Sequence, residues 1–168
     1  GLETIGEYAF SGCTGLTGIT LPQSLTLVGP EAFRGCTSLA GIDAEAGNPQ
    51  YASEQGVLYN GDKTELLLCP EGKSGELGVL GQAVRISFSA FQGCGKLAKL
   101  QVPESVLFIE NAAFSECSPE LALRVSKASY AEDYAKYYQM KLEVSGGHDS
   151  HDNRELLAEG VTCTTGGK

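Results

Sequence analysis

The chain has two histidines, His148 and His151, which lie three residues apart and beside two aspartates. Imidazole groups with this spacing share one face of a helix and can ligate a divalent metal ion. Gly146 and Gly147 precede them and no apolar shell surrounds them, so a solvated linker is the simpler interpretation and a metal site the alternative. Residues 1–147 contain no histidine, which excludes Ser-His-Asp and Cys-His catalytic sites from that part of the chain.

Three acidic residues, Asp43, Glu45 and Glu76, are predicted to lie on or near neighbouring strands. Two carboxyl groups about 5–10 Å apart can hydrolyse a glycoside. That reaction also needs an enclosed pocket that raises the pKa of one carboxyl group. A flat repeat face offers no such pocket, so we expect a protein that is not an enzyme and that holds no cofactor.

A repeated nonapeptide sets the framework of the fold, and this framework determines where the acidic residues lie. The nonapeptide reads as an apolar residue, three variable residues, Ala-Phe, two variable residues and Cys. The four copies are Ile5–Cys13, Val28–Cys36, Ile86–Cys94 and Ile109–Cys117. The phenylalanines are 23 residues apart within the first and the last pair, and such a period predicts a solenoid of stacked coils. We expect the phenylalanine rings to form one interior column, made of Phe10, Phe33, Phe91 and Phe114.

Four of the six cysteines occupy the last position of the nonapeptide. Equivalent side chains on stacked coils point inward in parallel, with Cβ atoms too far apart for good disulfide geometry. We therefore expect a ladder of small buried side chains rather than disulfide bridges. The four cysteines are Cys13, Cys36, Cys94 and Cys117.

A second apolar framework, L-x-x-L-x-L, follows the first three nonapeptides, with a looser match after the fourth. Its alternation indicates a strand, and Pro22 and Pro103 end that strand because proline cannot donate to a ladder. A further apolar pair, such as Leu25 with Val28, predicts a short extended segment on the opposite side of the coil. The fold class is therefore a mostly β, or α/β-type, solenoid.

These motifs resemble the BspA-like leucine-rich repeats of bacterial surface proteins over residues 2–125. The resemblance implies a right-handed superhelix of about 23-residue coils. The pattern is interrupted between Phe33 and Phe91, which are 58 residues apart, or two periods plus 12. In this interval Gly56–Tyr59 and Glu65–Cys69 flank an Asn-Gly-Asp stretch and predict an inserted β-hairpin, an element also familiar in BspA-like solenoids.

After the last repeat, four tyrosines with i, i+4, i+7 and i+8 spacing predict an amphipathic helix. Ser126 or Ser129 is the expected N-cap. A solenoid needs its last coil covered, so this helix is predicted to be a C-terminal cap. A tyrosine platform for carbohydrate is the alternative. Lys141–Val144 predicts a closing strand.

We expect one solenoid domain at residues 1–144, with the hairpin-bearing coil at about 45–75 and the capping helix at about 127–140. Residues 145–168 are polar and are predicted to form a linker into a downstream module. The chain starts within a repeat, so we interpret it as part of a longer protein. An exposed edge at Leu2 predicts edge-to-edge self-association.

The formal charge of −9 argues against a nucleic-acid partner, because phosphate binding needs a basic surface. No apolar run approaches the roughly 20 residues of a membrane span. Solenoids bind through the face made by successive strands, and small outward residues make that face shallow, which favours a protein or an extended glycan. Leu80 and Ala122 are expected to point outward there.

We expect the middle of this face to be acidic and its C-terminal end basic. The candidate binding residues are Thr20, Asp43, Glu76, Lys99, Gln101 and Arg124. The resemblance implies a secreted or surface-attached bacterial module for adhesion, with a host extracellular-matrix protein as partner. A structural spacer that presents a neighbouring domain is one alternative. A carbohydrate-binding module is another, and the near absence of aromatic residues on the strand face argues against it.

Overall fold

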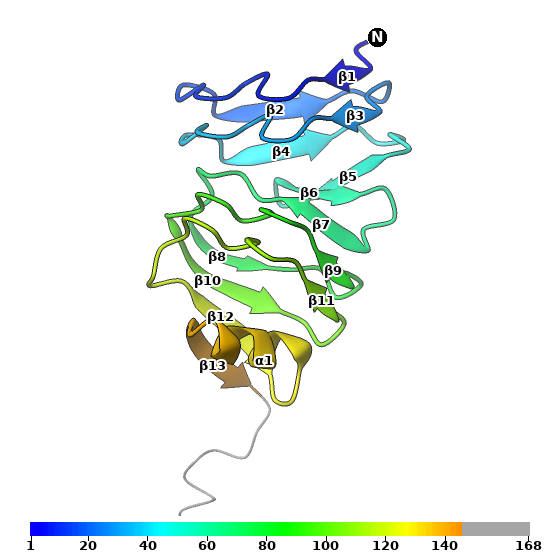
Figure 1. The fold of residues 1–168 in the computed structure, drawn as a ribbon. Helices are drawn as coiled ribbons and strands as arrows, with labels where there is room; N and C mark the ends of the chain where they lie inside the picture. Colours follow the sequence, from blue (N-terminus) through cyan, green and yellow to red (C-terminus); the bar gives the residue numbers. More distant parts are fainter. Residues whose placement is uncertain (146–168) are drawn as a thin grey trace, which may run out of the picture.

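The computed structural model describes residues 1–145, which form a stack of coils with strands on two walls (Figure 1). In chain order the elements are β1 (Thr4–Ile5), β2 (Gly18–Leu21), β3 (Leu27–Val28), β4 (Gly41–Ala44), β5 (Tyr51–Glu54), β6 (Val57–Asn60), β7 (Glu65–Leu68), β8 (Gly75–Gly78), β9 (Arg85–Ile86), β10 (Leu97–Val102), β11 (Phe108–Ile109), β12 (Ala122–Ser126), α1 (Tyr130–Tyr137) and β13 (Lys141–Ser145). One wall, the strand face, holds a two-stranded sheet, β2-β4, and a four-stranded sheet, β13-β12-β10-β8. The other wall holds β1-β3 and a five-stranded sheet, β11-β9-β7-β6-β5.

The strands of the strand face pair in parallel with the same register from coil to coil. Ile19 lies beside Ile42, and Leu100 lies beside Leu123. Alternation along each strand turns most of these apolar side chains into the core and leaves the intervening residues on the outside. The predicted solenoid with one short C-terminal helix is confirmed, and it is mostly β.

The inserted hairpin is also confirmed, because β6 and β7 pair in an antiparallel manner. Two features were not predicted. An additional strand, β5, pairs antiparallel with β6, so that the insert is a three-stranded meander. The last strand of the meander, β7, pairs in parallel with β9, with Leu66 beside Ile86, and this joins the insert to the next coil.

The aromatic column is interrupted by this insert. Phe10 stacks on Phe33 with ring centroids 5.4 Å apart, and Phe91 stacks on Phe114 at 5.1 Å. The prediction of one continuous column is wrong because the coil between the two pairs has no Ala-Phe sequence. In that coil Cys69 replaces the phenylalanine, because its N–H donates to an alanine carbonyl of the next coil as the N–H groups of Phe10 and Phe91 do.

The buried core divides at the same place. Leu58 of β6 packs in an N-terminal cluster that includes Phe33. Its two neighbours on the strand, Val57 and Tyr59, pack in a C-terminal cluster that includes Phe91. Successive side chains of a strand point to opposite faces, so β6 separates the two clusters.

Helix α1 closes the last coil. Of the two predicted caps, Ser129 is the one used, since its hydroxyl accepts a hydrogen bond from the Glu132 N–H at 3.2 Å. Ala131 and Ala135 are fully buried against the C-terminal cluster, whereas Tyr137 is 80% exposed. The predicted closing strand is confirmed as β13, which pairs with β12. Within residues 1–145, no helix is long and apolar enough to cross a membrane.

The cysteine ladder is buried only in its middle. Cys36 and Cys94 are buried and Cys117 is half-buried, but Cys13 is exposed. The expectation of a buried Cys13 is wrong because no coil covers the outer side of the first coil in the structure (Figure 1). The Cys36 and Cys117 thiols each donate to the phenylalanine carbonyl of the preceding coil at 3.0 Å. Burial raises the pKa of the Cys117 thiol to about 12.

Candidate functional site

The structure brings four charged residues of the strand face together, one from each strand of the four-stranded sheet. They are Glu76, Lys99, Arg124 and Glu143, here called the charge quartet. The Arg124 Nε and Nη2 atoms lie 3.1 Å from Glu143 Oε2, and the Lys99 Nζ atom lies 3.1 Å from Glu143 Oε1. Glu76 lies farther away, 3.9 Å from Lys99 and 4.0 Å from Arg124.

Glu143 changes the electrostatics that the sequence predicted. The C-terminal end of the face is not basic, because Glu143 pairs with both cations there. Hydrogen bonds from Lys99 and then from Arg124 lower the pKa of the Glu143 carboxyl group. The predicted closing strand contained the signal that was missed, since alternation places Glu143 outward and register places it beside Arg124.

The six predicted binding residues form two patches rather than one. Thr20 lies beside Asp43 in the two-stranded sheet. Gln101 lies beside Arg124, next to the charge quartet. The two sheets of the face are not joined, because β4 and β8 do not pair. The Ile42 N–H instead donates to the carbonyl of Gly56, in the turn between β5 and β6.

Two residues that were expected on the outside are not exposed. Ala122 is only 8% exposed, because register places its methyl group between the longer side chains of Lys99 and Lys141. Leu80 is half-buried and packs against the C-terminal cluster. It lies beyond the end of β8, and its N–H donates to the Tyr59 hydroxyl at 3.3 Å.

The candidate acid-base and metal residues do not assemble into a site in the described part of the chain. Glu45 accepts a hydrogen bond from the Gln23 N–H at 3.0 Å, and Glu76 belongs to the charge quartet. Residues 1–145 contain no group of three or more His, Cys, Asp or Glu side chains that could hold a metal ion. His148 and His151 lie outside the described residues.

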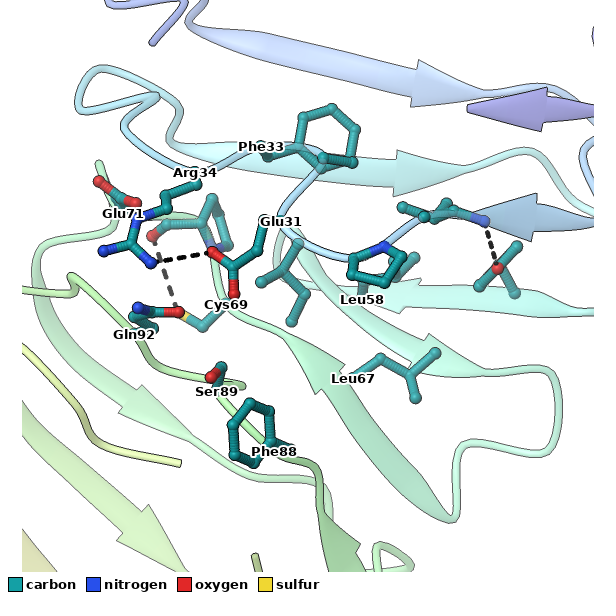
Figure 2. A pocket seen from close by; sticks show the side chains of 17 residues that line it. Glu31, Phe33, Arg34, Leu58, Leu67, Cys69, Glu71, Phe88, Ser89 and Gln92 are labelled. Atoms are coloured by element: carbon teal, nitrogen blue, oxygen red, sulfur yellow. Dashed lines mark hydrogen bonds and ion pairs between the residues drawn. The ribbon is translucent and has the colours of Figure 1, made fainter. Parts of the chain in front are cut away.

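Away from the strand face, the structure has a pocket of about 370 Å³ that the sequence did not predict (Figure 2). Its upper side carries Glu31, Phe33 and Arg34 from the Ala-Phe turn of the second coil. Its lower side carries Phe88, Ser89 and Gln92 from the corresponding turn of the fourth coil. Further lining residues from the third coil are Leu58, Leu67, Cys69 and Glu71.

The pocket exists because the turn of the third coil is short. Leu66 pairs with Ile86, so these two residues hold equivalent positions in successive coils. The Cys69 N–H donates to the Ala90 carbonyl at 2.7 Å, and the Phe91 N–H donates to the Ala113 carbonyl at 2.8 Å, so Cys69 and Phe91 are also equivalent. Ile86 and Phe91 are five positions apart, but Leu66 and Cys69 are only three positions apart. The third coil therefore does not fill the space between the Ala-Phe turns on either side.

Polar side chains replace the missing turn at the rim of the pocket. The Arg34 Nη1 atom lies 3.3 Å from Glu31 Oε2, and its Nη2 atom lies 3.0 Å from Glu116 Oε1. The Arg34 side chain therefore reaches across the fourth coil to the fifth. The Gly35 N–H donates to a side-chain oxygen of Glu71 at 2.7 Å. In the first coil, the equivalent N–H of Gly12 donates to a backbone carbonyl of the next coil, also at 2.7 Å.

Comparison with known proteins connects the repeat to a family. The family described as BspA type leucine rich repeat region matches six copies, over residues 1–61 and 79–143. No curated protein matches the chain. The unmatched interval contains the shortened turn of the third coil.

Solved structures with the same fold are larger than this chain. A leucine-rich repeat protein from Eubacterium ventriosum is 25% identical with a TM-score of 0.64, over 74% of this chain and 34% of that one. The pneumococcal vaccine antigen PcpA is 30% identical with a TM-score of 0.60, over 74% and 33%. A leucine-rich cell surface protein from Faecalibacterium prausnitzii, 20% identical with a TM-score of 0.58, shares the fold over 90% and 53%.

The chain thus spans about a third of the length of the first two of these proteins. The repeated nonapeptide, the stacked coils and the family match over most of the described residues lead to one conclusion: this chain belongs to the BspA-type leucine-rich repeat family.

Proposed function

We propose that this chain is a non-catalytic, protein-binding module of a secreted or surface-attached bacterial protein, and that it binds through the strand face. The proposed contact residues are Thr20, Asp43, Glu76, Lys99, Gln101 and Arg124. Two similar structures support the location, since one is a pneumococcal vaccine antigen and the other is described as a cell surface protein. The proposed partner is a host extracellular-matrix protein.

The observation that carries this proposal is the charge quartet. Its four side chains come from adjacent strands and hold one another by ion pairs of 3.1–4.0 Å. Side chains that are already ordered lose less conformational entropy when a partner binds. Charges of both signs on one surface select a complementary partner and accelerate its association more than they add affinity.

A binding assay on immobilised matrix proteins tests the proposal. Surface plasmon resonance should show about a tenfold or greater loss of affinity for the double variant Lys99→Glu/Arg124→Glu. The matched control is Lys63→Glu/Lys127→Glu, which changes the net charge equally, outside the quartet. Unchanged binding by the first variant, or equal loss by both, would show that the strand face is not the contact surface.

Two expectations from the sequence remain predictions. One is self-association through the exposed edge near Leu2, and the other is a further module after the solenoid.

A further inference from the structure

We infer that the pocket between the second and fourth coils is a docking site for a peptide that carries an aromatic side chain followed by a basic residue. This site is separate from the strand face and does not depend on the function proposed above. Its occupant follows from three properties of the pocket: its apolar lining, a free backbone donor and an acidic rim.

The apolar lining has the size and chemistry of a site for one aromatic ring. Phe33, Leu58 and Leu67 line the pocket, and its volume of about 370 Å³ lies near the lower end of the range for ligand sites. Phe88 stands at the rim with 60% of its surface exposed. An aromatic side chain that enters the pocket would cover part of this ring, and paired aromatic rings stabilise one another.

An unpaired backbone donor of a residue that lines the pocket favours a peptide over a purely apolar ligand. The N–H groups of Phe10 and Phe91 each donate to an alanine carbonyl of the next coil at 2.8 Å. Within residues 1–145, the equivalent N–H of Phe33 makes no such bond, because the third coil lacks an Ala-Phe turn. A buried N–H without a partner is unfavourable, and a peptide carbonyl in the pocket would accept from it.

The charges at the rim favour a cation beside the ring. Arg34 is already compensated by Glu31 and Glu116. Glu71 accepts from the Gly35 N–H, and among the described residues no cation lies within ion-pair distance of its carboxylate. A lysine or arginine that follows the aromatic residue would supply that cation.

Short blocked peptides test the inference by NMR on the ¹⁵N-labelled full chain. Acetyl-Ala-Phe-Lys-amide should shift the Phe33 amide proton downfield and should perturb the amides of Phe88 and Ser89. Acetyl-Ala-Ala-Lys-amide should bind about tenfold more weakly or not at all, and acetyl-Ala-Phe-Glu-amide should bind several-fold more weakly. Equal binding of the Phe and Ala peptides, or no shift at Phe33 at about 10 mM peptide, would overturn the inference.

Paired variants separate the pocket from general effects. Phe88→Ala should weaken the Phe-Lys peptide about fivefold, whereas Phe108→Ala, a comparably exposed phenylalanine outside the pocket, should not. Glu71→Gln keeps an oxygen for the Gly35 N–H and should remove the preference for the Lys peptide over the Glu peptide. The same losses in both phenylalanine variants, or an unchanged preference in Glu71→Gln, would contradict the site.

Two further measurements fix the class of ligand and the independence of the site. Phenethylamine has the ring and the cation but no carbonyl, so it should bind more weakly than the Phe-Lys peptide. Equal or tighter binding would identify a site for a small aromatic amine and would overturn the peptide assignment. The Lys99→Glu/Arg124→Glu variant should bind the peptide like the wild type, and a loss there would place the peptide on the strand face instead.

Discussion

The two ends of the coil stack are built from the same nonapeptide but are packed differently. In the C-terminal part, Phe91 is fully buried, and its stacking partner Phe114 also contacts Tyr134 of α1 with centroids 5.9 Å apart. In the N-terminal part, Phe33 is buried but its partner Phe10 is only partly covered. The stability of a solenoid is approximately a sum over coils and their interfaces, so identical repeat residues contribute differently according to their neighbours.

The insert connects these two parts through polar bonds as well as packing. The Tyr51 hydroxyl accepts from the Val28 N–H of the N-terminal part at 2.8 Å. The Tyr59 hydroxyl accepts from the Leu80 N–H of the C-terminal part at 3.3 Å. Each tyrosine thus satisfies a backbone donor at a place where the regular ladder between coils is interrupted.

The largest expected difference between the two parts concerns their phenylalanines. Phe91→Ala should lower the free energy of unfolding by about 4 kcal/mol, because it leaves a cavity in a fully buried stack. Phe10→Ala should lower it by only about 2 kcal/mol, since Phe10 is partly exposed and lies on the outermost coil. Urea unfolding followed by circular dichroism measures both, and equal losses would show that the two stacks are energetically equivalent.

A buried asparagine should show how strongly the N-terminal part depends on the insert. Asn48 donates to the carbonyls of Pro22 and Leu25, and its own side-chain oxygen accepts two backbone N–H groups. Asn48→Ala should destabilise the protein by about 3 kcal/mol, because buried backbone groups lose their partners.

Asn60 is the matched control, since its side chain makes similar bonds but only to Thr64 and Glu65 at an exposed turn. Asn60→Ala should destabilise the protein by about 1 kcal/mol in the same urea titration. If Asn60→Ala is as harmful as Asn48→Ala, then the bonds of Asn48 to the preceding coil have no special importance.

The tyrosine hydroxyls give a smaller and more selective contrast. Tyr59→Phe should lower the free energy of unfolding by about 2 kcal/mol, because Tyr59 is 1% exposed and the Leu80 N–H would lose its partner. Tyr51→Phe should lower it by about 1 kcal/mol, since Tyr51 is only half-buried. Hydrogen exchange should accelerate at Leu80 in the first variant and at Val28 in the second; acceleration at both sites in both variants would mean that the parts open together.

The smallest effect is expected from the charge quartet. Lys99 and Arg124 lower the pKa of Glu143 below its ordinary value of 4.5. The ion pairs therefore stabilise the fold fully above pH 4.5, and this stabilisation is lost as the pH falls through the lowered pKa of Glu143.

A carbon-detected NMR titration of the Glu143 carboxyl group measures this pKa directly. Lys99→Gln should raise it toward 4.5, whereas Lys63→Gln, which lies outside the quartet, should leave it unchanged. An unchanged pKa in Lys99→Gln would show that Lys99 does not hold the Glu143 carboxylate.

Particular residues show how far the sequence predicts this molecule. The hairpin was predictable because Asn-Gly-Asp is a local turn signal between two apolar runs. The helix and a serine cap were predictable for the same reason, since capping depends on residues three positions apart, but only the structure chose Ser129 over Ser126. The phenylalanine column was only half predictable, because it requires each intervening coil to carry an Ala-Phe turn, and the third coil does not.

The sequence by itself determined the coil, the fold class and the family, because the period and the apolar alternation are local properties that recur in most of the coils. The tertiary structure alone decided which charges and side chains meet. Glu143 joins Lys99 from two strands away in the sheet, and Arg34 reaches Glu116 across 82 positions of the chain. The pocket depends on the short turn of the third coil, the divided core on the position of β6, and the charge quartet on the register of four strands. Each of these brings together residues that are far apart in the sequence, so no local pattern predicts them.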